Sequence, residues 1–225
     1  MKISALLAAF NTERYVAAAV TSIISQTSPA FEIIAVDDGS SDGTAAALRE
    51  FCDRVRVLEL PHRGAPQAFN AAIAAASGEF LAFNDADDLW APTKLATQGA
   101  LLASRPDLDA VFGAVQQFAS PDWTAGASSP AMPPQAGINK IGMLIRRSAF
   151  ERVGSFDTSF HYCEFGDWYA RALQVGLRVE QHAEIVGYRR LHASNTGRIH
   201  RDAARDEHLL ALKRSLDARR RLTGA

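Results

Sequence analysis

The chain has 225 residues, a length that fits one α/β domain or two small ones. Its 24 lysines and arginines against 25 acidic residues give a net charge of −1, which offers no electrostatic case for a nucleic-acid partner. The hydrophobic share of 48% and the charged share of 22% are typical of a globular protein. Cys52 and Cys163 lie far apart without metal-ligand spacing, so we expect no disulfide framework and a reducing compartment, the cytoplasm.

Short apolar runs alternate with helical patterns through the first 105 residues. The opening run is too short for a signal peptide and predicts a core strand, and no run approaches the ~20 apolar residues that span a bilayer. The expected strands are 3–9, 31–36, 55–60 and 79–83, and the expected helices are 12–25, 42–51, 65–76 and 92–104. This alternation predicts an α/β fold with a mostly parallel central sheet flanked by helices on both faces.

The pattern changes after residue 105. The expected strands are 109–118, 141–145 and 178–185, and the expected helices are 147–153, 164–175 and 200–222. Prolines, glycines and small polar residues fill 119–137, which predicts a mobile loop over the site. Neither an internal repeat nor a linker is visible, so we expect one domain whose parts are 1–105, 106–197 and 198–225.

Polar side chains follow each of the first four expected strands. They are Asn11, Asp37–Asp38, His62–Arg63 and Asp85–Asp88. Ligands of parallel sheets bind outside the carboxyl ends of the strands. Four polar tips on one edge therefore predict a binding site, whereas a single one would be ordinary loop chemistry.

The segment "VDDGSSDGT" at 36–44 has two other interpretations. An EF-hand loop starting at Asp38 would place Arg49 at its twelfth position, where a bidentate Glu is required, so this interpretation fails. A solvated turn in which Ser41 or Asp42 caps the next helix explains Asp42 but not two adjacent acids at a strand end.

The segment "DADD" contains the pair Asp85-x-Asp87 directly after an apolar strand. Carboxylates are the ligands that Mg²⁺ and Mn²⁺ prefer, and a bound diphosphate can supply the remaining oxygens. Haloacid-dehalogenase-type phosphatases use a similar pair followed by Thr, but Leu89 occupies that position here. A capped turn remains the structural alternative, and Asp88 is the acid that such a turn explains best.

Taken in order, the motifs resemble a known family. "FNTERYVAAAVTSIISQTSPAFEIIAVDDGSSDGT", "FNAAIAAASGEFLAFNDADDLWAPTKL" and "AFERVGSFDTSF" are similar to segments of inverting family 2 glycosyltransferases of the GT-A fold. The resemblance covers residues 1 to about 195. It implies a Rossmann-like nucleotide-sugar-binding half at 1–105 and an acceptor and catalytic half at 106–197. It further implies metal-dependent transfer of a sugar from a nucleoside diphosphate donor, UDP-type first, to an acceptor hydroxyl, with a role in polysaccharide or cell-surface glycan synthesis.

The resemblance also implies roles for individual residues. Asp85 would face the ribose, and Mn²⁺ or Mg²⁺ would be bound by Asp87 with Asp85 and His192. The remaining contacts of the nucleotide sugar would come from Ala8, Phe10, Asn11, Glu13, Asp38, Arg63, Asn70 and Arg190. The family often has Ala-Arg-Asn where this chain has Ala68-Phe69-Asn70, so only Arg63 is left to supply that cation.

The general base is the largest departure from the family. The family carries a segment similar to Glu-Asp-x-Asp-x-Trp at a helix start, and alignment with "CEFGDWYARALQVG" puts Phe165 at the usual base. Glu164 or Asp167 would then deprotonate the acceptor, because residues three apart share a helix face. In the alternative interpretation both acids only favour the helix dipole. "YRRLHASNTG" resembles the family's late Tyr-Arg-x-His-x-x-Asn, in which His192 would meet the metal or diphosphate.

Partners and localisation follow from these patterns. We expect a nucleoside diphosphate sugar as donor and a hydroxyl acceptor that is a glycan, lipid-linked or a peptide. The 200–222 helix is expected to pack one apolar stripe on the body, with a homodimer contact or a peripheral contact at the inner face of the membrane as alternatives. A degenerate, non-catalytic nucleotide-sugar-binding or accessory protein is the second functional hypothesis. A nucleotidyltransferase is disfavoured because no Gly-rich, basic triphosphate loop follows the first strand.

Overall fold

The computed structural model describes residues 1–121, 123, 137–195 and 199–223. The strands are β1 (Ile3–Ala9), β2 (Glu32–Asp37), β3 (Arg56–Glu59), β4 (Phe80–Asp85), β5 (Leu89–Trp90), β6 (Ala110–Ala119), β7 (Met143–Arg146) and β8 (Val179–Leu191). The helices are α1 (Val16–Ile24), α2 (Thr44–Arg49), α3 (Ala65–Ala75), α4 (Lys94–Ser104), α5 (Arg147–Val153), α6 (Glu164–Gln174) and α8 (Arg201–Thr223). Strands and helices alternate as predicted up to α4.

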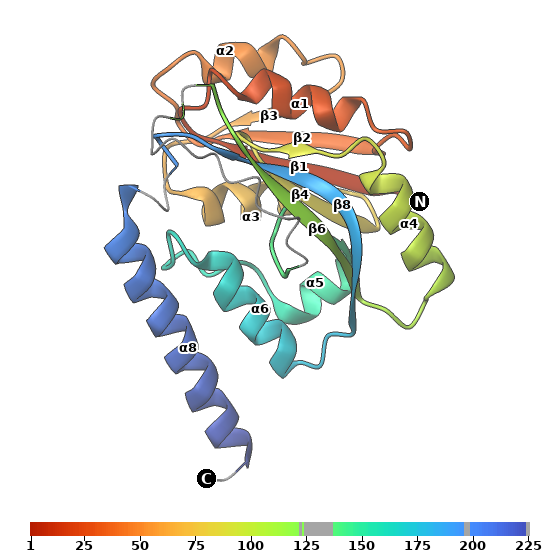
Figure 1. The fold of residues 1–225 in the computed structure, drawn as a ribbon, viewed down its shortest axis with the longest axis vertical. Helices are drawn as coiled ribbons and strands as arrows, with labels where there is room; N and C mark the ends of the chain where they lie inside the picture. Colours follow the sequence, from red (N-terminus) through yellow and green to blue (C-terminus); the bar gives the residue numbers. More distant parts are fainter. Residues whose placement is uncertain (122, 124–136, 196–198, 224–225) are drawn as a thin grey trace.

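All eight strands form one mixed sheet with the order β3-β2-β1-β4-β7-β6-β8-β5 (Figure 1). Strands β1 to β4 run parallel. Strand β7 is antiparallel to both of its neighbours, β4 and β6, while β8 runs parallel to β6 and β5 antiparallel to β8. The parallel half therefore places its carboxyl ends on one edge, where ligands of such sheets bind.

The central strands are apolar on both faces because helices cover both. One core cluster joins one face of β1 to α1, α2 and α4 through residues such as Leu7, Val20 and Leu95. The second cluster joins the other face to α3, α5 and α6 through Phe69, Phe150 and Trp168. This three-layer arrangement is the fold predicted from the sequence.

Helix α8 packs along α6 on the outer side of the second helix layer (Figure 1). The Glu207 carboxylate accepts main-chain N–H groups of His161, Tyr162 and Cys163 at 2.7–3.0 Å, directly before α6. The Arg214 guanidinium pairs with Asp157 at 2.9 Å. One face of α8 is thereby attached to the segment that carries the start of α6.

Two differences from the predicted elements affect the site. Strand β5 was not predicted, and β8 continues six residues past the predicted end at 185. Both arise from long-range pairing, because Leu89 and Trp90 pair with Tyr188 and Gly187. Most of the loop predicted at 119–137 lies outside the described residues. Among the described helices, none is long and apolar enough to cross a membrane.

Candidate functional site

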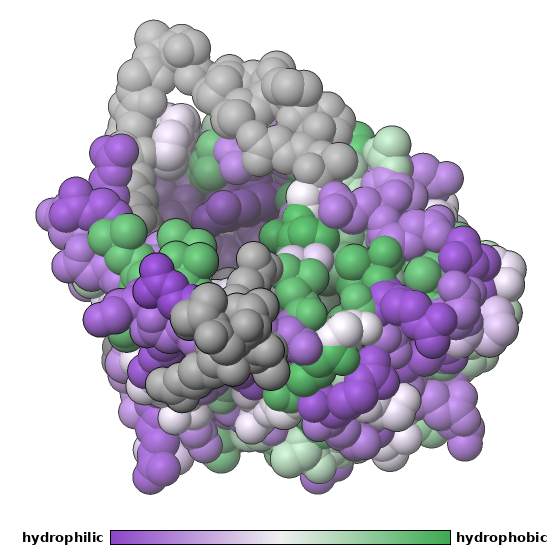
Figure 2. Space-filling view, turned by 90° about the horizontal axis from the view of Figure 1, so that it is seen from below, coloured by the Kyte–Doolittle hydropathy of each residue, from purple (hydrophilic) through white to green (hydrophobic). Residues whose placement is uncertain are grey.

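The first part of the candidate site is the carboxyl edge of the parallel strands. Ala8 pairs with Asp85 on one side of β1, and Ala9 pairs with Asp37 on the other. The end of β4 thus lies beside the end of β1, as the strand pattern predicted. Seen from below, the molecule has a hollow whose visible floor is hydrophilic (Figure 2).

The turn after β4 has a tight structure of its own. The Asp88 N–H donates to the Asp85 carbonyl at 3.0 Å, and the Asn84 carboxamide donates to the Asp88 carbonyl at 3.1 Å. The Trp90 indole N–H donates to the Phe83 carbonyl at 3.1 Å, which ties β5 back to β4. These bonds fold the acidic segment over the strand end.

Asp88 does more than cap this turn. Its Oδ1 accepts the main-chain N–H of Arg190 at 2.8 Å, and the residue is buried. Burial raises the pKa of Asp88 well above its usual value, and the neighbouring charges of Asp87 and Asp85 add to the effect. Asp88 therefore links the acidic turn to β8.

Asp87 meets the two late motif residues that the sequence singled out. Its Oδ2 lies 2.9 Å from the Nε2 atom of His192 and 3.4 Å from the Asn195 amide nitrogen. The Arg190 Nε donates to the Asp87 carbonyl at 2.9 Å. The Arg190 guanidinium also lies over the rings of Tyr15 and Phe118, 5.0 and 4.7 Å from their centroids. Residues about a hundred positions apart are thus brought together as predicted.

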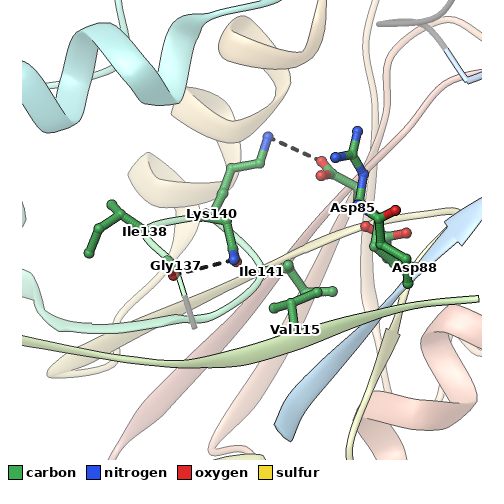
Figure 3. Close-up of a pocket in the computed structure, with 10 residues that line it drawn as sticks. Asp85, Asp88, Val115, Gly137, Ile138, Lys140 and Ile141 are labelled. Carbon is green, nitrogen blue, oxygen red and sulfur yellow. Dashed lines mark hydrogen bonds and ion pairs between the residues drawn. The ribbon is translucent and has the colours of Figure 1, made fainter. Parts of the chain in front are cut away.

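A pocket of about 460 Å³ opens beside this turn (Figure 3). The residues that line it include Asp85, Asp88, Val115, Gln117, Lys140 and Arg189. The Lys140 side chain points at Asp85 (Figure 3), with its Nζ 3.1 Å from Oδ1, and the same Nζ lies 2.7 Å from Glu164 Oε1. Partial burial raises the pKa of Asp85, and the Lys140 charge opposes that rise.

Glu164 and Asp167 lie in the first turn of α6 but take different partners. Glu164 pairs with Lys140 and so approaches the pocket beside Asp85. Asp167 pairs with the Arg171 guanidinium at 2.9 Å and lines a separate hollow of about 230 Å³ with Arg214 of α8. The two acids share a helix turn, as predicted, yet only Glu164 is connected to the acidic turn. Phe165 packs against Phe112, Trp168 and Tyr169.

The predicted nucleotide residues of the first loop bind the second loop. Asn11, at a φ of +50°, accepts the Ser41 N–H through its Oδ1 at 2.9 Å. The Glu13 carboxylate accepts the Gly43 N–H at 2.6 Å. Phe10 is exposed and stacks on His62 at 3.8 Å between ring centroids, and Ala8 is half-buried on β1. The structure therefore gathers these residues at one edge, and Asn11 and Glu13 fix its shape.

Asp38, Arg63 and Asn70 have contacts that the sequence did not predict. The buried Asp38 carboxylate accepts the main-chain N–H groups of Arg63 and Gly64 at 2.9 and 2.8 Å, just before α3. The Arg63 side chain is exposed. The Asn70 carboxamide binds the Phe156 main chain through both polar atoms, at 2.9 and 3.0 Å. Its predicted diphosphate contact stays a prediction and requires it to leave Phe156.

Sequence reasoning missed Lys140 and Tyr15 as site residues. Lys140 follows a segment without periodic pattern, and its partners Asp85 and Glu164 are distant in the chain. The single available signal was a lysine beside an apolar strand, which is a weak one. The Tyr15 ring packs at a tilt against the His192 ring, with 4.6 Å between their centroids. Tyr15 was not singled out because it falls within the helix predicted at 12–25.

The donor atoms at Asp87 and His192 suit a divalent cation. One carboxylate oxygen and one imidazole nitrogen lie 2.9 Å apart, and Mn²⁺ accepts both kinds of ligand. Within residues 1–121, 123, 137–195 and 199–223, no cluster of three or more His, Cys, Asp or Glu side chains forms a metal site. The fit therefore requires further oxygens from a ligand such as a diphosphate.

Comparisons with known proteins identify the family. The family described as "Glycosyl transferase family 2" matches residues 4–163. An uncharacterised glycosyltransferase of Nostoc is 40% identical over 99 residues, which cover 42% of this chain and 31% of that protein. The Escherichia coli enzyme WfgD, named a UDP-Glc:alpha-D-GlcNAc-diphosphoundecaprenol beta-1,3-glucosyltransferase, is 36% identical over 102 residues, or 44% of this chain and 40% of WfgD. The matches thus span less than half the length of either relative.

A solved structure shows the same fold. The mannosyltransferase PcManGT from Pyrobaculum calidifontis, solved with GDP-Man and Mn²⁺, aligns with a TM-score of 0.73 and 21% identity. The alignment covers 96% of this chain and 64% of that one. The mixed sheet and its helix layers are therefore those of a GT-A fold, and the chain belongs to glycosyl transferase family 2.

Proposed function

We propose that the protein transfers a sugar from a nucleoside diphosphate sugar, of the UDP type, to an acceptor hydroxyl with inversion, in polysaccharide or cell-surface glycan synthesis. One observation carries the proposal. The acidic turn at Asp85 and Asp87 contacts His192 and Arg190 beside a pocket. Glu164 approaches the same pocket from helix α6. The named activity of WfgD supports the UDP-type donor and the glycan product.

A divalent cation, Mn²⁺ or Mg²⁺, would be held by Asp87 and His192, with Asp85 beside them. Such an ion neutralises charge on a leaving diphosphate. The Arg190 guanidinium lies against the same turn and adds a fixed positive charge beside the proposed diphosphate position. The exposed Arg63 is the proposed further cation. The uracil-type base would lie over Ala8 and Phe10, near Asp38.

Glu164 is the proposed general base. Inversion requires a group that takes the acceptor proton on the face of the sugar opposite the leaving diphosphate. Glu164 approaches the pocket from α6, whereas the proposed diphosphate position is at the end of β4. Asp167 lines the separate hollow with Arg214 of α8, whereas Glu164 is connected to Asp85 through Lys140, which makes Asp167 the weaker of the two candidates.

Calorimetry with UDP and Mn²⁺ tests the donor site. We expect wild-type protein to bind UDP in the presence of Mn²⁺ and Asp87→Ala to bind it at least tenfold more weakly. The matched control is Asp206→Ala, which removes an exposed acid on α8 far from the turn. No binding by wild type, or undiminished binding by Asp87→Ala, would refute the assignment.

Donor hydrolysis and sugar transfer test the base. Glu164→Gln keeps the size of the side chain and removes its proton acceptor, so we expect a loss of roughly two orders of magnitude or more in turnover. Asp167→Asn serves as the matched variant in the same helix turn and should retain turnover if Glu164 is the base. The reverse pattern would assign the base to Asp167.

A non-catalytic nucleotide-sugar-binding protein is the second candidate. The observation that favours it is Phe165, which stands at the family's usual base and is packed among aromatic rings. If wild type binds UDP with Mn²⁺ but turns over no donor with any acceptor, this candidate replaces the first.

The outer face of α8 is the proposed surface for a membrane or a second copy. Leu209, Leu212 and Leu216 are 54–61% exposed and recur on one helix face, while the opposite face packs on α6. A leucine stripe beside Lys213 fits shallow insertion into an anionic lipid surface, consistent with a lipid-linked acceptor at the inner face of the membrane. Flotation with anionic vesicles and light scattering of the free protein distinguish the two partners.

A further inference from the structure

Lys140 sits in a rigid frame between the two halves of the candidate site. Only 9% of its side chain is exposed. The loop that carries it is fixed by the Asn139 Oδ1, which accepts the Gly142 N–H at 2.6 Å, and by the Gln98 amide, which donates to the Gly142 carbonyl at 2.7 Å. The position of its ammonium is therefore set by the fold.

The Lys140 ammonium has three close neighbours. Two are carboxylates, with Asp85 Oδ1 at 3.1 Å and Glu164 Oε1 at 2.7 Å from Nζ. The third is the Phe69 ring, whose centroid lies 4.1 Å from Nζ. The ammonium is therefore engaged with side chains of the protein itself.

The ammonium is what allows two carboxylates to face one pocket. Glu164 is buried, and Asp85 has Asp87 and Asp88 as close acidic neighbours. Without a cation between them, the two carboxylates would repel each other and turn apart. The two carboxylate oxygens at 2.7 and 3.1 Å from Nζ favour the charged form of the Lys140 side chain.

We propose that Lys140 is a positioning residue that fixes the acceptor-side carboxylate of Glu164 relative to the donor-side carboxylate of Asp85. This inference rests on the proposed function, because it takes Glu164 as the base and Asp85 as a donor contact. A displacement of about 1 Å between reacting groups can lower a rate by roughly two orders of magnitude. One lysine thereby sets the geometry at both reacting partners.

The two contacts of Lys140 differ in length and exposure, and this difference predicts which contact breaks when the donor binds. The contact with Glu164 is shorter and enclosed, whereas the Asp85 side chain is 40% exposed and its contact is longer. A hydroxyl group of the nucleotide sugar or a cation can therefore replace Lys140 as the partner of Asp85, while Lys140 stays paired with Glu164. Lys140 would then keep the base in place through the reaction.

The test compares Lys140→Met, Lys140→Arg and wild type. For Lys140→Met we expect UDP affinity, measured by calorimetry with Mn²⁺, to stay within about threefold of wild type, because the donor or the cation replaces Lys140 at Asp85 when it binds. We expect kcat to fall about a hundredfold, which is a larger change than that of KM for the donor. Lys140→Arg keeps the charge, so its kcat should be at least tenfold higher than that of Lys140→Met. Lys2→Met, an exposed lysine far from the site, is the matched control.

A second variant separates positioning from simple misfolding. Lys140→Met leaves two uncompensated acids, so Lys140→Met/Glu164→Gln should have a higher melting temperature than Lys140→Met alone. A kcat of Lys140→Met within twofold of wild type would overturn the proposal. So would a melting temperature that the second substitution leaves unchanged. If wild type transfers no sugar, the proposed function fails, while the melting temperatures still decide whether Lys140 bridges the two acids.

Discussion

Replacing Lys94 with methionine tests the electrostatics of a fully buried ammonium. The Lys94 Nζ donates to Gln98 Oε1 at 2.7 Å and to the Met143 carbonyl at 3.2 Å. The described residues give it no carboxylate partner, and burial lowers the pKa of Lys94 to about 7 from the usual 10.5. The folded protein therefore releases this proton far below the pH at which the unfolded chain does.

The sign of the stability change follows from proton binding. Below about pH 7 both states carry the Lys94 proton, so the free energy of unfolding does not change through this group. Between about 7 and 10.5 the unfolded chain binds one proton more, so stability rises with pH. Each pH unit in that window adds about 1.4 kcal/mol, which is roughly 5 kcal/mol in all, an order-of-magnitude figure. Because Lys94 is fully buried, solvent screening does not reduce this contribution.

Urea unfolding at about pH 7 and about pH 9 measures the effect. We expect wild type to gain roughly 2 kcal/mol more than Lys94→Met over this interval. The difference between the two proteins isolates the lysine, because all other titrating groups are shared. Lys2→Met, which removes an exposed lysine, should keep the wild-type gain. Equal gains in wild type and Lys94→Met would refute a neutral lysine in the folded protein at high pH.

Two further substitutions probe contacts that the sequence did not predict. Asn70→Ala removes both hydrogen bonds to the Phe156 main chain, so we expect urea unfolding to show a free energy of unfolding that is lower by about 2 kcal/mol. We expect the UDP affinity of this variant to equal that of wild type. Weaker UDP binding at unchanged stability would instead place Asn70 at the diphosphate. Glu207→Ala leaves three N–H groups before α6 without their acceptor and should lower the melting temperature by roughly 4–8 °C. Asp206→Ala, in an exposed weak pair, should change it little, and an equal effect of the two would contradict the anchoring role of Glu207.

The strands and helices of the first 105 residues were predictable because their patterns are local. Apolar runs at 3–9 and 79–83 gave β1 and β4 to within two residues, since both strands are buried on both faces. Helix starts were less well predicted: the helix expected from 12 begins at Val16, because the residues before it bind the loop at 40–44 instead. Local pattern therefore identified elements better than their ends.

The candidate site was predictable only where a short motif carried it. The acidic turn was predicted from its Asp-x-Asp motif, and its contact with His192 was expected from the late motif. The sequence could not predict that Glu164 and Asp167 take different partners, because two residues in the same helix turn can contact different neighbours. Lys140 and the pairing of β5 with β8 depend on contacts between distant segments, which a single sequence does not record.

The reversed strand β7 has a consequence for how such proteins can be recombined. The parallel half of the sheet, β3-β2-β1-β4, is joined to β7 by three residue pairs, Phe80 with Arg146, Leu81 with Ile145 and Ala82 with Leu144. Apart from β5, the strands on the other side of these pairs come from later in the chain, so one crossover between β4 and β6 would exchange most of that side of the sheet. A chimera made there needs compatible partners at few sheet positions, with Lys140 among the residues to carry across.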